Sequence, residues 1–216
     1  MKKIMFDDAC SLTQAVKGGR KTNTRRQEKA LDKEVQKHEE TYKVPFSIVS
    51  QYYDFGKERL VIKTPKEVIY VKPRYKVGDV VAVAEAYKDV PDLEPQDLVL
   101  SKGEYIPACM TQGWANKEFV RADIMPERLR ITDVRVERLQ DISDEDCIME
   151  GVFLDETAPS CYQPFYTFPG SIDYDTPVGY KTPREAFAAL IDKVSGKDTW
   201  KKNPWVFVYD FELAND

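Results

Sequence analysis

The sequence predicts an α+β fold: a small mixed β-barrel with flanking short helices and loop or hairpin insertions. Two strands indicate the barrel. Residues 80–85 (VVAVAE) are apolar on both faces, as in a central strand. Residues 205–213 (WVFVYDFEL) form a long closing strand with alternating aromatic side chains. A helix begins after Thr182, because Pro183 and Glu185 supply the proline and glutamate of a capped first turn.

Composition is consistent with one folded domain spanning residues 1–216. A chain of 216 residues suits one large domain, and a hydrophobic content of 42% is enough for a packed core. The formal net charge of −5 argues against a protein that coats long duplex DNA, which needs a basic footprint. A local basic pocket for one nucleotide or a short single strand stays open.

The chain has neither a signal-peptide core nor a window near the ~20 apolar residues of a membrane helix. Its cysteines form no CxxC pair, and its one histidine, His38, makes a zinc site of ordinary spacing improbable. We therefore expect a cytoplasmic protein with reduced thiols, no metal and no other cofactor. The four cysteines are Cys10, Cys109, Cys147 and Cys161.

Residues 18–26 (GGRKTNTRR) combine two glycines, four cations and two hydroxyls. A capping box at 11–14 predicts a short helix that ends at these glycines. The glycines allow a sharp turn and a close approach to a ligand, and the cations suit a phosphate, a carboxylate or a polar heterocycle. A basic, solvated turn is the plainer interpretation. If the stretch is extended, Lys21 and Thr24 lie on opposite faces unless the strand twists or bulges.

Residues 27–41 predict a charged surface helix on which His38 is solvated. A β-meander of two or three strands follows, at 46–49, 59–63 and 67–71.

The segments 88–119 and 152–180 are rich in proline and glycine and read as long loops, which tend to be functional or insertions. The aromatic residues of 152–180, Tyr162 and Tyr174 among them, could form a stacking wall for a base or cover the core.

Three charged positions lie near the ends of predicted elements. Arg128 precedes a strand in which the apolar parity changes, so we expect a bulge or bend near Asp133. Glu85 ends the apolar strand, and Glu150 ends a short helix capped by Ser143, where the helix dipole disfavours a negative charge. Each charge could line a pocket at the barrel mouth or simply be exposed.

In this order the segments resemble the ASCH domain of the PUA-like β-barrel superfamily. Residues 19–26 (GRKTNTRR) fit the family hallmark G-x-K-x-x-T-x-R, and the resemblance spans nearly the whole chain, most closely the longer type found in phage and prophage genomes. The insertions would be 27–72, 88–119 and 152–180. Further matching segments are 76–79 (KVGD) with Glu85, 134–143 (VRVERLQDIS), 150–151 (EG) and 203–206 (NPWV).

The resemblance implies binding of RNA or a modified nucleoside. Small relatives remove the acetyl group of N4-acetylcytidine with a lysine, a threonine and a glutamate, which correspond to Lys21, Thr24 and Glu150 here. This chain is about twice as long, so its insertions could reshape the pocket. The expected ligand contacts are Arg20, Arg25, Arg26, Glu85 and Arg128.

The chemistry leaves two assignments open. Thr24 would be the nucleophile, and it needs a base within hydrogen-bond reach. Either Lys21 is that base, with a pKa far below ~10.4, or Glu150 is the base and Lys21 stabilises the oxyanion. Three functions follow as hypotheses: a nucleotide-binding or RNA-binding module, an amidohydrolase of N-acylated nucleosides, and a protein-interaction factor.

Overall fold

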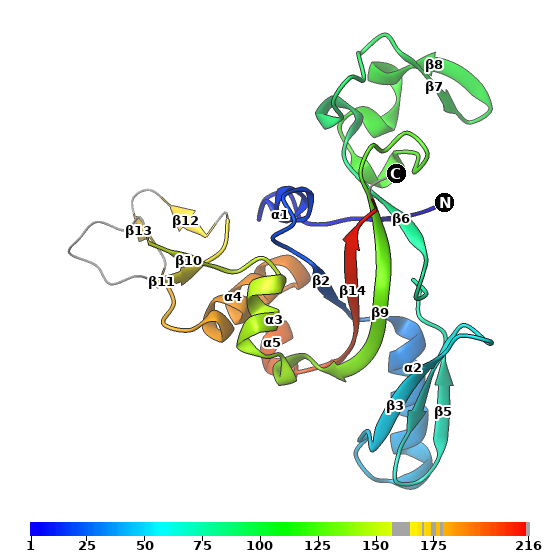
Figure 1. Cartoon of the computed structure of the whole chain (residues 1–216), viewed down its shortest axis with the longest axis vertical. Coiled ribbons are helices and arrows are strands. Elements are labelled where there is room, and N and C mark those ends of the chain that lie inside the picture. The colour runs from blue at the N-terminus through cyan, green and yellow to red at the C-terminus, as the bar shows by residue number, and fades with distance from the viewer. Residues whose placement is uncertain (157–164, 170, 174–175, 178, 215–216) are drawn as a thin grey trace.

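The computed structural model describes residues 1–156, 165–169, 171–173, 176–177 and 179–214 (Figure 1). Helices and strands are mixed along the chain, and the central layer is a five-stranded sheet with the order β1-β6-β9-β14-β2. β1 runs parallel to β6, and the other neighbours are antiparallel. The bounds are β1 (Lys2–Ile4), β2 (Asn23–Arg26), β6 (Val80–Val83), β9 (Arg128–Arg138) and β14 (Trp205–Leu213).

The expected closed barrel is wrong for the described part of the chain. β1 and β2 form the two edges of the five-stranded sheet and do not pair with each other, so the sheet stays open. The apolar strands were located correctly, since β6 and β14 lie inside the sheet and are mostly buried. An apolar strand shows that both faces are covered, but it does not show whether the sheet closes.

The long β9–β14 ladder contains the predicted bulge. Asp210 pairs with Asp133, whereas the next residue, Phe211, pairs with Ile131. Thr132 is therefore the extra residue, and it brings the apolar side chains on both sides of it into the core.

The helices are α1 (Leu12–Lys17), α2 (Lys29–Tyr42), α3 (Asp144–Met149), α4 (Pro183–Ser195) and α5 (Thr199–Lys202). The predicted caps of α3 and α4 are confirmed: Ser143 accepts from the Asp146 N–H at 3.0 Å, and Thr182 from the Glu185 N–H at 3.2 Å. The capping box of α1 is wrong, because Ser11 has a φ of 47° and its side chain caps no backbone group.

The insertion after β2 consists of α2 and an antiparallel sheet of β3 (Ser50–Asp54), β4 (Arg59–Lys63) and β5 (Val68–Val71). The first strand begins four residues later than expected. The solvated position expected for His38 is also wrong. His38 is buried, its Nδ1 lies 2.9 Å from Glu67 Oε1, and its ring meets the edge of Phe46. Leu31 and His38 are seven residues apart, which is about two helical turns. Both side chains therefore lie on the face of α2 that packs inward.

The region 88–119 is a small subdomain rather than a bare loop. It holds the hairpin β7 (Leu98–Ser101) and β8 (Glu104–Pro107) and the short 3₁₀ segments η1 (Tyr87–Asp89), η2 (Ala108–Met110), η3 (Gln112–Trp114) and η4 (Lys117–Phe119). Figure 1 shows this subdomain at one end of the molecule and the β3–β5 sheet at the other. A fifth 3₁₀ segment, η5 (Leu139–Asp141), leads from β9 toward α3.

In the region 152–180 the structure describes two small hairpins, β10 (Phe153–Asp155) with β11 (Phe165–Thr167) and β12 (Ile172–Asp173) with β13 (Thr176–Pro177). The stacking wall expected there includes Tyr162 and Tyr174, which lie outside the described residues. Phe168 is buried and packs on Tyr180, so this part of the region covers the core.

Cys10 and Cys147 are buried free thiols and Cys109 is an exposed one, as expected, while Cys161 lies outside the described residues. No helix in the described part is long and apolar enough to cross a membrane.

Candidate functional site

The basic stretch turns back on the end of α1 and then enters β2. Gly19 has a φ of +69°, a conformation that glycine adopts without strain. The Lys21 N–H donates to Ala15 O at 3.0 Å, and the Thr22 N–H donates to Met149 O at 3.0 Å. These two bonds fix the stretch between α1 and α3, and they direct the Lys21 side chain toward the C-terminal end of α3.

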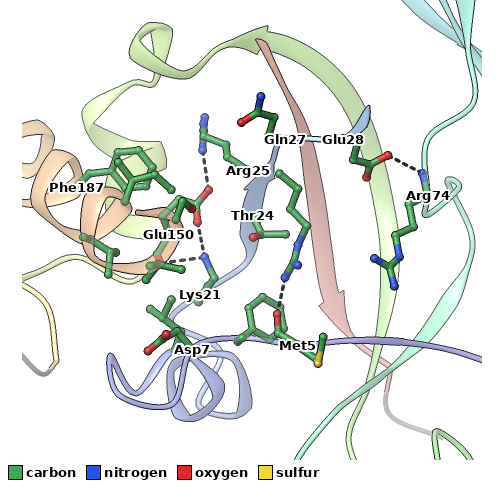
Figure 2. A pocket seen from close by; sticks show the side chains of 17 residues that line it. Met5, Asp7, Lys21, Thr24, Arg25, Gln27, Glu28, Arg74, Glu150 and Phe187 are labelled. Atoms are coloured by element: carbon green, nitrogen blue, oxygen red, sulfur yellow. Dashed lines mark hydrogen bonds and ion pairs between the residues drawn. The ribbon is translucent and has the colours of Figure 1, made fainter. Parts of the chain in front are cut away.

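Lys21 and Glu150 form a buried ion pair. The Lys21 ammonium contacts Glu150 Oε2 and also donates to the Glu150 carbonyl at 3.0 Å (Figure 2). The side chains are only 1% and 7% exposed. Because Glu150 caps the C-terminal end of α3, the ammonium also offsets the negative end of the helix dipole. The carboxylate that the dipole disfavours is therefore held by a cation.

Arg25 holds Glu150 from a second direction. Its guanidinium is fully buried and lies 3.3 Å from Glu150 Oε1, 2.7 Å from a carboxylate oxygen of Glu137 and 2.6 Å from one of Asp146. Three carboxylates thus occupy the guanidinium donors. Arg25 lines the pocket, and its ion pair with Glu150 orients that carboxylate.

Thr24 lies on β2 opposite Tyr209 of β14 and is 5% exposed. Figure 2 shows its hydroxyl on the side of the strand that faces Lys21 and Glu150. All three line one cavity of about 440 Å³. Lys21 lies before β2, which begins at Asn23, so the alternation of the strand does not set the direction of its side chain, and the three predicted catalytic side chains line one pocket.

The pocket has a polar side and an apolar side. The polar side comes from the basic stretch, its continuation at 27–28 and Glu150, and the apolar side comes mainly from α4. The apolar side chains are those of Phe187, Leu190, Ile191 and Val194, together with Phe6 and Leu12.

Burial lowers the pKa of Lys21 below its ordinary value of 10.5. Glu150 opposes this shift, since a carboxylate stabilises the ammonium, while Arg26 and Arg25 reinforce it. Arg25 shares the Glu150 carboxylate with Lys21, so that one negative charge lies between two cations.

Arg26 carries a donor that the fold does not use. Its Nε is buried and has no hydrogen-bond partner among the described residues, although another guanidinium nitrogen donates to Met5 O at 2.6 Å. A buried donor without an acceptor costs about 1–3 kcal/mol. An acceptor on a ligand in the pocket would relieve that cost.

Glu28 and Arg74 complete the rim, and neither was predicted. Glu28 accepts from the Tyr209 hydroxyl and, at 3.1 Å, from the Arg74 N–H. Burial raises the pKa of Glu28, against the opposing hydrogen bonds. Arg74 lies in the turn before β6. In the sequence it is one cation beside Pro73, and nothing in that pattern predicts that it lines a pocket. The apolar face of α4 was visible in the sequence, but its contribution to a pocket depends on tertiary packing.

Three of the expected ligand contacts do not reach the pocket. Arg20 is exposed at the turn. Glu85 is buried in an ion pair with Lys17 at 3.0 Å and borders a different hollow. Arg128 starts β9 opposite Ala82. None of these three is among the described residues that line the pocket. A position near the end of a predicted element does not show on which side of the sheet the side chain will lie.

In the described part of the chain, no group of three or more His, Cys, Asp or Glu side chains is placed to hold a metal ion. Comparisons with protein-family models, with curated proteins and with solved structures gave no match to this chain.

Proposed function

We propose that the pocket binds a modified nucleoside and hydrolyses its exocyclic N-acyl group, on a PUA-like, ASCH-type scaffold whose sheet is open. The observation that carries the proposal is the convergence of Lys21, Thr24 and Glu150 on one cavity. The resemblance of residues 19–26 to the ASCH hallmark supports the substrate class, with N4-acetylcytidine as the first candidate.

The shape and lining of the pocket suit such a ligand. A volume of about 440 Å³ falls in the range of small-molecule sites, about 300–1,000 Å³. The unused Arg26 Nε–H can donate to a carbonyl oxygen of the base. The apolar side chains of α4 can hold the methyl group of an acyl substituent.

The proposed reaction begins with the Thr24 hydroxyl oxygen attacking the acyl carbonyl carbon, while neutral Lys21 takes the hydroxyl proton. Collapse of the tetrahedral intermediate breaks the carbon–nitrogen bond, and Lys21 returns the proton to the departing amine. A water molecule then hydrolyses the ester on Thr24, which releases the carboxylic acid and restores the hydroxyl. The lowered pKa of Lys21 favours lysine as the base, and Glu150 positions its amine.

Conversion of N4-acetylcytidine to cytidine tests the proposal. The wild type should release cytidine, and Lys21→Met should lose about 10²–10⁴-fold in rate, the usual contribution of a general base. Arg20→Ala is the matched control, because it removes a neighbouring cation that is exposed and outside the pocket, and it should keep the wild-type rate. Absence of turnover by the folded wild type contradicts the proposal.

A binding-only role is the second candidate, favoured by the unused donor of Arg26 beside the exposed Arg74. It predicts that N4-acetylcytidine binds by calorimetry but stays intact, and that Arg26→Lys weakens binding. Turnover that is lost in Lys21→Met rules this candidate out.

A further inference from the structure

The β3–β5 sheet presents a row of aromatic and apolar side chains on its outer face. Tyr52 of β3 pairs with Val61 of β4, and Val61 pairs with Tyr70 of β5, so the three side chains lie side by side on one face. The alternate residues, Leu60 and Ile62 among them, are buried on the inner face. The two tyrosines are 63% and 52% exposed, whereas Val61 between them is 4% exposed.

A cation lies over one of these rings. The guanidinium of Arg59 is 3.8 Å from the centre of the Tyr70 ring and is also paired with Asp54 at 3.4 Å. A cation–π contact of this kind holds the ring in place and lays a planar guanidinium over one of its faces, and a base can itself stack on a guanidinium plane. Two strand spacings separate the Tyr52 and Tyr70 positions, about 9–10 Å, so the two rings are independent stacking surfaces.

The charge on this face is opposite to that of the whole chain. Arg59 and Lys63 lie on it by the alternation of side chains, with Asp54 as the carboxylate opposite Arg59, and Lys72 directly follows β5. Lys63 and Lys72 are exposed. The protein as a whole carries a formal charge of −5. A local excess of cations among exposed aromatic rings is complementary to a polyanion whose bases can stack.

A short segment of chain links the outer face to the nucleoside pocket. Arg74, four residues after Tyr70, lines the pocket, and exposed Lys72 lies between them. Even fully extended, four residues span only about 13 Å, a short reach for a polynucleotide. The cations of this segment therefore connect the aromatic row to the pocket rim.

We propose that the outer face of the β3–β5 sheet, defined by Tyr52, Tyr70 and Arg59, binds single-stranded RNA by base stacking. Two bases stack on the tyrosines, and Arg59, Lys63 and Lys72 contact the backbone. RNA is the strand expected because the adjoining pocket is proposed to take a ribonucleoside. The choice of RNA over DNA rests on the proposed function, whereas the stacking site does not, so a failure of nucleoside hydrolysis leaves single-strand binding at this face standing.

The test is fluorescence anisotropy with a labelled single-stranded RNA of about twelve nucleotides. The wild type should bind it, and the double variant Tyr52→Ala/Tyr70→Ala should bind at least tenfold more weakly. Tyr52→Phe/Tyr70→Phe should keep the wild-type affinity, because the ring and not the hydroxyl carries stacking. Tyr105→Ala is the matched control: Tyr105 is 69% exposed on β8, in the subdomain at the other end of the molecule.

The outcomes separate this inference from the proposed function. RNA binding that depends on the two tyrosines supports the inference even if N4-acetylcytidine is not hydrolysed. Hydrolysis of the free nucleoside should proceed at the wild-type rate in the double alanine variant. Equal RNA affinity of wild type and double variant, no RNA binding by the wild type, or tighter binding of DNA of the same sequence overturns it.

Discussion

Arg25 and Glu150 are joined by an ion pair of 3.3 Å in which the side chains are 0% and 7% exposed. The pair connects β2 to the C-terminal end of α3, two elements that are far apart in the sequence. Because the other carboxylate oxygen of Glu150 holds Lys21, the position of Arg25 determines where the Lys21 amine lies. The geometry of the site therefore depends on a cation in the pocket lining whose donors are held by carboxylates of the protein.

Arg25→Ala should destabilise the fold strongly. The substitution removes the fully buried cation that Glu150, Glu137 and Asp146 share, and breaking a buried ion pair in this way costs about 3–5 kcal/mol. Urea unfolding measures the loss. Arg20→Ala, at an exposed position nearby, should stay within about 0.5 kcal/mol of the wild type. A loss below about 1 kcal/mol for Arg25→Ala contradicts the network described.

Glu150→Gln should reduce the rate of N4-acetylcytidine hydrolysis by about 10²–10⁴-fold, because the neutral amide no longer positions Lys21 as a base. Asp146→Asn is the matched comparison. Asp146 contacts Arg25 at 2.6 Å but lies outside the pocket lining, so its substitution should lower stability while keeping most of the rate. Initial rates and thermal unfolding of the two variants separate these effects. Equal rate losses argue that Glu150 acts only through folding.

The lowered pKa of Lys21 predicts how stability changes with pH. In the unfolded chain Lys21 titrates near 10.5, so between its lowered pKa and that value the unfolded state binds more protons than the folded state. The unfolding free energy should therefore rise with pH in this window, by up to about 1.4 kcal/mol per pH unit. Lys21→Met removes this contribution.

The measurement is the unfolding free energy of the wild type minus that of Lys21→Met at several pH values. The difference should grow steadily toward pH 10.5 and stay constant below the lowered pKa. The comparison cancels other titrating groups such as Cys10, whose pKa burial raises to about 11. A difference that does not change with pH shows that Lys21 is charged throughout.

Gly151→Ala should destabilise the protein by about 1–2 kcal/mol, through strain and crowding together. Gly151 has a φ of +112°, and an added Cβ would lie 3.0 Å from Leu12 Cδ2. This glycine lets the end of α3 approach α1, which keeps Glu150 beside Lys21. Gly196→Ala is the control for backbone strain alone, since its φ is +101° but its Cβ would meet no atom within 4 Å. Equal losses in the two variants show that crowding at Gly151 is unimportant.

The sequence was sufficient for features that depend on local chemistry. The caps at Ser143 and Thr182, the bulge beside Asp133 and the turn at Gly19 all follow from residue type and parity, and the structure contains them. Whether Lys21 and Thr24 converge could not be decided from the sequence, because it depends on where β2 begins and on the Lys21 N–H bonding to Ala15 O at the end of α1.

Features that depend on tertiary packing were missed. His38 looks solvated within a charged helix, and only the docking of α2 buries it against Phe46 and Glu67. Glu85 was placed near the pocket because it ends a strand, but it pairs with Lys17 instead. The open sheet was missed for the same reason, since neither segment shows whether the edge strands β1 and β2 pair with each other, and in the structure they do not.

The most direct test of the account is the rate of N4-acetylcytidine hydrolysis by Thr24→Val compared with the wild type and Thr24→Ser. Valine keeps the shape of the buried side chain and removes the nucleophilic oxygen, whereas serine keeps the oxygen. We predict cytidine release by the wild type and Thr24→Ser and no detectable release by Thr24→Val, which should still bind the nucleoside. Equal rates in the wild type and Thr24→Val would contradict the central claim that Thr24 carries the reaction.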